Sequence, residues 1–218
     1  MDRGTVAVIG LCLALAAWYA VGHLYNLRHG RRLFAWLDAG LEVLGGERTA
    51  GWIGSAASGA RIQVLHAEAP FRRLEITLLL ERREIPLLWL LDHLRGRRDG
   101  LIIKATLRSP RPGELEVASP RRSLLEPTVA DYRREPSWAG EEGPHGLLVL
   151  HRGPGTERQV ARLWPWLQTY GRVLRRLVWQ KSDPHVQLYL DLVEWATTSS
   201  RELLNDLRTA VSVSHMNK

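Results

Sequence analysis

The sequence predicts an α+β protein in which a single N-terminal transmembrane helix is followed by a soluble domain of mostly antiparallel sheet, with helices on one face. Three observations lead to this prediction. An uncharged apolar run occupies residues 5–22. Several later segments alternate apolar and polar residues with a period of two, which is typical of half-buried strands. Helical patterns lie between these segments, and helices packed on one face of an antiparallel sheet bury both kinds of element economically.

The composition is that of a folded chain. Of the 218 residues, 45% are hydrophobic and 24% are charged. These values are ordinary for a globular protein and exclude global disorder. The formal net charge is +7, and only Lys104, Lys181 and Lys218 among the 30 basic residues are lysine. Because Cys12 is the single cysteine, the chain cannot form an internal disulfide or an internal thiolate metal site.

Residues 1–30 are interpreted as a membrane anchor. A bilayer core about 30 Å thick is crossed by about 20 helical residues, and the apolar character continues past Gly22 to Leu27. A signal peptide usually has a shorter apolar core, of about 7–15 residues, followed by a small-x-small cleavage site. Ala20-Val21-Gly22 matches such a site only weakly. A retained anchor is therefore the leading interpretation, and a cleaved signal and a buried core helix are the alternatives.

Charge predicts the orientation of this anchor. Three arginines follow the apolar run, whereas only Asp2 and Arg3 precede it. Because basic residues next to a span favour the cytoplasmic side, the soluble domain is expected in the cytoplasm, with a very short tail outside. Tyr25 is expected at the level of the lipid headgroups, where aromatic residues are enriched. The predicted membrane-interface residues are Tyr25, Arg28, Arg31 and Arg32.

Residues 31–59 are predicted to form a juxtamembrane amphipathic helix and a Gly-rich linker. The helix carries an apolar stripe at helical spacing, made by Leu33, Phe34, Leu37, Leu41 and Leu44. This stripe either faces the core of the domain or lies on the inner leaflet. Gly45-Gly46 end the helix, and one short helix is expected near residues 49–54. The glycines of the linker lack the Lys-Ser or Lys-Thr of a phosphate-binding loop.

Residues 60–118 form the first predicted α+β half. Alternation predicts strands near residues 61–67, 74–82, 101–107 and 115–117. A helix is predicted between the second and third of these strands, with Pro86 in its first turn, where proline is tolerated. Residues 119–145 are rich in Pro, Arg and Glu and are predicted to be a long exposed loop or a boundary between the two halves.

Residues 146–218 form the second predicted half. Strands are expected near residues 147–151, 172–180 and 186–192. A helix is expected over residues 156–170, opened by a Thr156/Gln159 capping box, and Pro165 is expected to kink it or delay its start. A second capping box, Ser199/Glu202, is expected to start the last helix.

The two halves can be aligned with each other. Segments 89–96 (WLLDHLRG) and 164–171 (WPWLQTYG) share their length, their first Trp and their last Gly. Each is preceded by a predicted strand and followed by a strand, a Pro-containing turn and a strand. Two βαββ-like, ferredoxin-like halves are one arrangement that this order allows. The similarity arises either by duplication or by the ordinary repetition of α+β steps.

No group of residues in the sequence indicates catalysis. The eight histidines show no zinc-binding spacing, and the chain has no GxSxG nucleophile motif. Asp183 and His185 flank Pro184, but an aspartate before proline more often builds a turn than acts in acid–base chemistry. No cofactor or metal is expected, and the protein is not expected to be an enzyme. An enzyme whose site is assembled from distant residues is kept as the third hypothesis.

Arginine doublets are the most consistent charged feature. They are Arg72-Arg73, Arg82-Arg83, Arg97-Arg98, Arg121-Arg122, Arg133-Arg134 and Arg175-Arg176. Clustered arginines favour both anionic lipid and nucleic acid, but no nucleic-acid-binding motif accompanies them, so nucleic acid is not an expected partner. The leading hypothesis is a membrane-anchored, cytoplasm-facing binding or scaffold protein. Its expected partners are the lipid bilayer, through the N-terminal helix, and another protein or a second copy of itself. The alternative is a membrane-tethered nucleic-acid or phosphate-ligand binder that uses the doublets.

Overall fold

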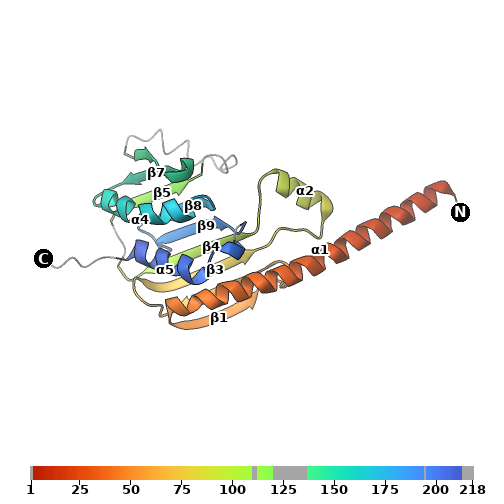
Figure 1. Ribbon diagram of the computed structural model, residues 1–218, viewed down its shortest axis with the longest axis horizontal. Helices are drawn as coiled ribbons and strands as arrows, with labels where there is room; N and C mark the ends of the chain where they lie inside the picture. The colour runs from red at the N-terminus through yellow and green to blue at the C-terminus, as the bar shows by residue number, and fades with distance from the viewer. Residues whose placement is uncertain (1, 110–111, 120–136, 194, 213–218) are drawn as a thin grey trace.

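The computed structural model describes residues 2–109, 112–119, 137–193 and 195–212. A long N-terminal apolar helix is followed by a nine-stranded sheet with helices, which confirms the predicted α+β class (Figure 1). The strand order is β1-β2-β3-β4-β9-β8-β5-β7-β6, and every described pairing is antiparallel. The strands are β1 (Glu47–Trp52), β2 (Gly59–Leu65), β3 (Phe71–Leu79), β4 (Gly100–Leu107), β5 (Glu114–Ala118), β6 (Ala139–Glu142), β7 (Leu148–Arg152), β8 (Leu174–Trp179) and β9 (Val186–Asp191).

The helix α1 (Arg3–Leu41) runs without interruption across the border predicted at residues 30 and 31, and the 3-10 turn η1 (Glu42–Leu44) extends it. No proline interrupts this segment. Its buried positions recur every three or four residues, which keeps them on one side of the helix; they are Gly22, Asn26, Gly30, Leu33, Leu37, Gly40 and Leu41. The stripe that packs on the domain thus begins within the predicted anchor, and it faces the core.

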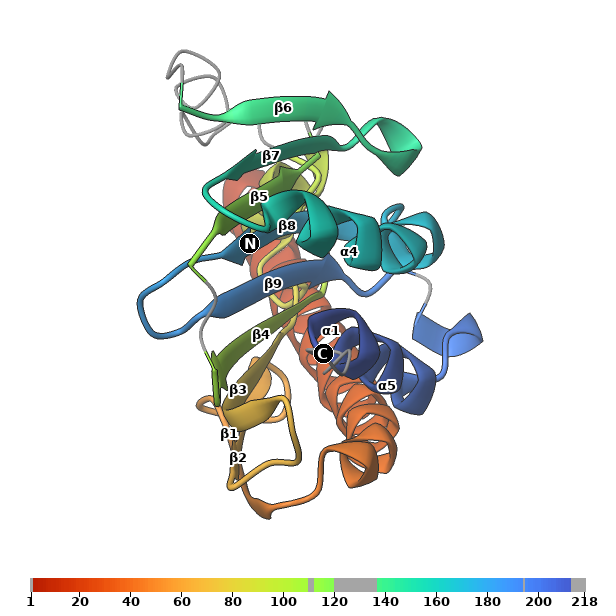
Figure 2. The ribbon, with the colours of Figure 1, turned by 90° about the vertical axis from the view of Figure 1, so that its left-hand side faces the viewer.

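The other helices are α2 (Pro86–Leu94), α4 (Thr156–Tyr170) and α5 (Ser200–Val211), with 3-10 turns η2 (Pro144–Gly146) and η3 (Trp195–Thr197). Helices α1, α5 and α4 lie on one face of the sheet, and α5 contacts both of the others (Figure 2). Their apolar stripes and the inward residues of the strands form one hydrophobic core, whose largest fully buried side chains include Phe71, Leu37 and Trp179. By contrast, α2 lies beyond the end of the sheet, beside α1 (Figure 1).

Two strands were missed by the sequence pattern. The helix expected near residues 49–54 is wrong, because these residues belong to strand β1 and its bend. The predicted loop over residues 119–145 contains β6, while residues 120–136 lie outside the described part of the chain. Both strands lie at edges of the sheet and are exposed along their whole length. Such strands are held by backbone pairing and therefore show no apolar alternation.

The two halves of the domain are connected differently, so ferredoxin-like halves are not confirmed. In the second half, α4 connects β7 to β8, and β5 lies between these two strands and is antiparallel to both. Strands β7 and β8 are therefore parallel to each other, which makes this half a split βαβ unit. In the first half, α2 connects β3 to β4, which are direct antiparallel neighbours. The connection between β3 and β4 is therefore not a crossover between parallel strands, and α2 does not have the place on the sheet that α4 has.

The two predicted capping boxes differ in outcome. Ser199 caps α5, since its hydroxyl accepts the backbone N–H of Glu202 at 3.4 Å. The prediction for Thr156 is wrong, because Gly155 occupies the N-cap of α4 and the Thr156 hydroxyl donates to the carbonyl oxygen of Gly153. A left-handed glycine already starts that helix, so the threonine is placed one position too late to cap it.

Candidate functional site

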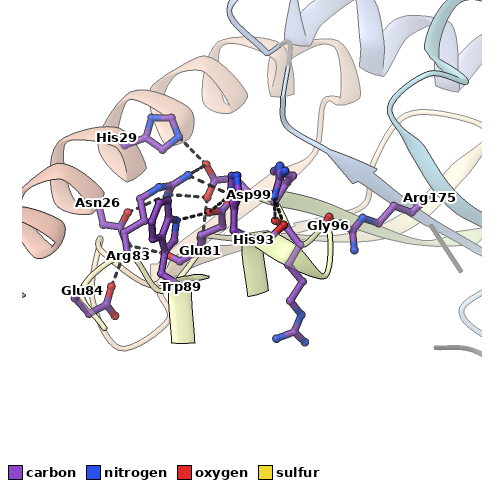
Figure 3. A network of polar contacts seen from close by, with 12 residues as sticks. Asn26, His29, Glu81, Arg83, Glu84, Trp89, His93, Gly96, Asp99 and Arg175 are labelled. Atoms are coloured by element: carbon purple, nitrogen blue, oxygen red, sulfur yellow. Dashed lines mark hydrogen bonds and ion pairs between the residues drawn. The ribbon is translucent and has the colours of Figure 1, made fainter. Parts of the chain in front are cut away.

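A network of polar side chains lies where α1 leaves the sheet, and it joins this helix to the connections that flank α2 (Figure 3). Two members come from α1, one from α2, and the others from the segments just after β3 and just before β4. We name it the exit network, and its members are Asn26, His29, Glu81, Arg83, Glu84, Trp89 and Asp99.

Arg83 and Asp99 form the centre of the exit network. The two terminal nitrogens of Arg83 donate to the two carboxylate oxygens of Asp99 at 3.0 and 2.8 Å, the bidentate geometry of strong ion pairs. The same carboxylate accepts the backbone N–H of Glu81 at 2.8 Å and lies 2.9 Å from Nε2 of His29. Asp99 is buried, so these contacts provide the pairing that a buried charge requires.

Asn26 is completely buried, although it closely follows the apolar run. Its amide nitrogen donates to the carbonyl oxygen of Glu81 at 2.7 Å and to Oε2 of Glu84 at 3.1 Å. Its amide oxygen accepts a hydrogen bond from Arg83 at 3.0 Å. Both donors and the acceptor of the amide are thus used. Asn26 thereby fixes the rotation of α1 against the segment after β3.

Burial by itself would raise the pKa of Asp99. The hydrogen bonds from His29 and Arg83, together with the positive charge of Arg83, outweigh burial and lower this pKa to about 2. Burial also acts on Arg83, whose pKa it would lower, but the partners Asp99 and Glu81 reverse this effect and the pKa is raised. Asp99 is therefore ionised at neutral pH and has no proton to donate there. The centre of the exit network is organised to hold segments together.

Trp18 and Gly22 continue the contact toward the N-terminus. The indole N–H of Trp18 donates to the carbonyl oxygen of Arg83 at 2.9 Å, and the rings of Trp18 and Trp89 lie 6.0 Å apart. Gly22 lies against the same segment, because a Cβ atom at this position would come within 2.5 Å of the Arg83 carbonyl oxygen. The small residue that resembled part of a cleavage site is therefore required for close packing.

The predicted membrane-interface residues lie on α1 at the level of the exit network and beyond it. Tyr25 is exposed on one side, stacks on His29 with ring centroids 5.5 Å apart, and lies 5.3 Å from the guanidinium carbon of Arg83. The side chains of Arg28, Arg31 and Arg32 are exposed, and no side-chain hydrogen bond or ion pair joins them to another described residue. The structure thus brings only Tyr25 to the exit network, and lipid contact by the arginines stays a prediction.

A second charged cluster lies near the C-terminal end of α2. Asp92 pairs with Arg82 at 2.8 Å and with Arg97 at 3.3 Å. Arg175 of β8 pairs with Asp191 of β9 and donates to a backbone carbonyl of the α2–β4 connection. These residues line a cavity of about 380 Å³ at the same end of the sheet. Arg82, Arg97 and Arg175 are matched by carboxylates within the cavity wall. The fourth lining arginine, Arg98, donates to the backbone carbonyl oxygens of His93 and Arg97 instead.

The same compensation applies to most of the arginine doublets. Residues 121–122 and 133–134 lie outside the described part of the chain. Six of the eight described doublet arginines pair with carboxylates: Arg73 with Asp183, Arg82 and Arg97 with Asp92, Arg83 with Asp99, Arg175 with Asp191 and Arg176 with Glu116. Much of the charge that clustered arginines suggested is therefore used inside the domain.

Asp183 and His185 hold the turn between β8 and β9 against β4. The Thr106 hydroxyl donates to Asp183, and Arg73 pairs with the same carboxylate at 3.0 Å. The Nδ1 atom of His185 accepts the backbone N–H of Leu107 at 3.0 Å. Across residues 2–109, 112–119, 137–193 and 195–212, no three His, Cys, Asp or Glu side chains are grouped so as to hold a metal ion.

Sequence reasoning missed the exit network because its partners are far apart in the chain. Asn26 and Glu81, for example, are 55 residues apart, and no spacing rule connects them. One signal was available. The apolar stripe, traced backward from Leu33 at helical spacing, passes through Gly30 and Asn26 to Gly22. A polar amide flanked by glycines on the buried side of a helix indicates a hydrogen-bonded contact with backbone.

By length and composition, α1 with its 3-10 extension could cross a membrane, and the apolar stretch that meets this criterion is entirely unburied within the domain. A signal sequence near an N-terminus meets the same criterion. No protein-family model matches the sequence, and no similar sequence is found among curated proteins.

Proposed function

We propose that this protein is a single-pass membrane protein whose domain faces the cytoplasm and acts by binding a protein partner, as a scaffold without catalysis of its own. The observation that carries the proposal is the continuity of α1. Residues 3–21 are exposed along their whole length, while the following residues contribute Leu33, Leu37 and Leu41 to the core. The helix is an anchor and a core element at once.

Retention of the anchor is supported by the contacts of its inner end. Cleavage after Gly22 would remove Trp18, whose indole bonds to Arg83 and packs on Trp89. It would also cut a helix whose next buried residue is Asn26. Since the exit network fixes α1 in rotation and position, a retained helix would hold the domain at one orientation to the bilayer. That property suits a scaffold.

The cytoplasmic orientation is supported by the free arginines. Arg28, Arg31 and Arg32 have no described carboxylate partner, so their charges can interact with anionic headgroups. Basic residues that flank a membrane span also favour the cytoplasmic side. Before the apolar run, the positive charge of Arg3 is offset by the negative charge of Asp2.

The face of the sheet opposite the helices is the binding surface that we propose. Outward residues of neighbouring strands form rows across it: Thr77, Ile102 and Tyr189 in one row, and Glu75, Lys104 and Gln187 in the next. All are partly exposed. Tyr189 is of a residue type enriched in protein interfaces, whereas Glu75 and Lys104 are of types depleted there. We therefore place the centre of the binding surface on the row that holds Ile102 and Tyr189. Nucleic acid is disfavoured, because most described doublet arginines are already paired with carboxylates.

The anchor and its orientation are tested in sealed vesicles of known sidedness that carry the full chain. We expect the intact-length protein to stay in the membrane after carbonate washing. In a Cys12→Ser background, Lys181→Cys, which is exposed, should react with an impermeant maleimide only where the cytoplasmic side is accessible. Release by carbonate, loss of the first residues, or labelling from the opposite side would each contradict the proposal.

The binding surface is tested by photo-crosslinking in native membranes. A photoreactive residue at Tyr189 should capture a protein, whereas the same residue at Glu202, exposed on α5 on the other side of the domain, should not. An Ile102→Arg substitution should abolish the crosslink from position 189. Equal capture from both faces, or capture that survives Ile102→Arg, would contradict the assignment of this surface.

A further inference from the structure

The short helix α2 turns its apolar side away from the domain. Five of its nine residues are leucine. Leu87, Leu90, Leu91 and Leu94 recur at the spacing of one helical face, and they are 66%, 47%, 39% and 74% exposed. The preceding Ile85 is 42% exposed. In a water-soluble domain such a stripe faces the core.

The side of α2 that faces the domain is the polar one. Asp92 is buried and pairs with Arg82 and Arg97. Trp89 directs its indole N–H to Oε2 of Glu81 at 2.9 Å. Since buried polar groups need partners and apolar groups do not, the helix could not be turned over without leaving Asp92 unpaired. The outward direction of the leucines is therefore fixed by contacts.

The position of α2 along α1 places these leucines at membrane depth. Trp89 packs on Trp18, and an apolar cleft of about 500 Å³ between the two helices extends along α1 from Gly22 to Ala14. At a rise of 1.5 Å per residue, residues 5–22 cover about 27 Å, so the whole run is needed to cross a core of about 30 Å. Trp18 then lies about 6 Å inside the end of the run, and α2 lies beside it.

Basic residues flank the apolar stripe. Arg82 and Arg83 precede α2, and Arg95, Arg97 and Arg98 follow it. Because Asp92 and Asp99 pair with Arg82, Arg83 and Arg97, the flanking charges without a described carboxylate partner are those of Arg95 and Arg98. The side chain of Arg95 is exposed and has no described hydrogen-bond or ion-pair partner. A short apolar face bordered by arginines is the pattern of a helix that lies in the interface of an anionic leaflet, with its apolar face about 5–10 Å deep. This depth agrees with the position of Trp18.

We infer that α2 is a second membrane-contacting element, which inserts its leucine face into the acyl chains of the leaflet from which α1 emerges. The inference rests on the proposed anchor. Together, α1 and α2 contact the bilayer at two places that are joined by the exit network. The domain is then fixed in tilt as well as in distance, since tilting it away from the leaflet would draw the leucines out of the acyl chains.

Lipid-borne quenching tests this inference on the full chain in vesicles. The protein is reconstituted in phosphatidylcholine with a minority of phosphatidylglycerol, with and without bromine on the acyl chains. The native Cys12, which is exposed on α1, carries a fluorophore that reports the anchor. In a Cys12→Ser background, Leu87→Cys and Leu94→Cys report α2, and Lys181→Cys, in the turn at the opposite end of the sheet, is the control.

We expect brominated lipid to quench labels at positions 12, 87 and 94 several-fold more strongly than the label at position 181. Because Leu87 and Leu94 are largely exposed, these labels do not disturb the core. Quenching at Cys12 together with control-level quenching at positions 87 and 94 would overturn the inference and leave the anchor intact. Control-level quenching at Cys12 would overturn the anchor, and the inference with it.

Discussion

The two parts of α1 meet different surroundings with different sequences. Residues 5–21 are apolar around the whole circumference and exposed throughout. Residues 22–41 are apolar on one side only and carry charged residues on the other. The glycines differ in the same way. A Cβ at Gly10 would meet nothing within 4 Å, whereas one at Gly30 would come within 2.0 Å of the carbonyl oxygen of Ala56.

This difference shows that the two parts of one continuous helix carry residue patterns suited to two different surroundings. An all-round apolar surface suits lipid, where no face is excluded. A stripe with embedded glycines suits a sheet and loops that approach the helix backbone closely. The change occurs at Gly22, the first buried residue of α1, which lies against the Arg83 segment, and the exit network lies at this point. The same substitution made on either side of Gly22 is therefore expected to change the free energy of unfolding of the domain by different amounts.

The largest effect is expected for leucines in the two parts. Leu37 is 1% exposed within the core, so Leu37→Ala should lower the free energy of unfolding of the domain by about 3.5 kcal/mol, through lost burial and a residual cavity. Leu13 is 66% exposed, and Leu13→Ala should leave this free energy unchanged. Chemical denaturation of the full chain in detergent, followed by circular dichroism, measures both. Equal effects of the two substitutions would contradict the border at Gly22.

Glycines give the second comparison. Gly30→Ala would push a methyl group into the backbone at Ala56, and we expect a loss of about 2.5 kcal/mol because overpacking of a close contact forces the backbone to move. Gly10→Ala has open space around it and should not destabilise the domain, since alanine also favours helix more than glycine does. The same denaturation experiment applies. A tolerated Gly30→Ala would mean that α1 is not pressed on residue 56.

Much of this fold could be predicted from the sequence, and the reasons are local. Period-two alternation predicted β3 and β9, and apolar spacing predicted the helix over residues 31–44, which is the second part of α1 with η1. Each of these elements buries one side only, so its apolar residues recur with the period of the element and reveal which side is buried. Edge strands β1 and β6 bury neither side. Their pairing is decided by the neighbouring strand, and a local pattern does not reveal it.

The exit network and the direction of α2 could not be predicted in this way. The apolar pattern of α2 was identified, but a pattern does not say whether the leucines face a core or a membrane. That direction is decided by Asp92, whose partners Arg82 and Arg97 make its side of the helix the buried one. Likewise, Asp99 acquires its role from Arg83 and His29, which reach it from other elements.

The smallest effect is expected at low pH, where Asp99 of the exit network becomes protonated. The pKa of Asp99 is about 2 in the folded protein, below the ordinary value of 3.8. A group whose pKa is depressed by folding contributes stability that is complete above the ordinary pKa and is lost as the pH falls toward the folded value. Asp99 should therefore contribute about 2 kcal/mol at neutral pH, and this contribution should disappear between about pH 4 and pH 2.

The substitution Asp99→Asn isolates this contribution from that of other carboxylates, because the amide keeps the shape of the side chain and has no charge to lose. The difference in unfolding free energy between the wild-type chain and Asp99→Asn should be about 2 kcal/mol larger at about pH 6 than at about pH 2. Denaturant titrations across this range measure the difference. A gap that stays constant with pH would show that Asp99 does not hold α1 through its charge. The junction between the two parts of the helix would then depend on shape and neutral hydrogen bonds, with Asn26 and Gly22 as its principal residues.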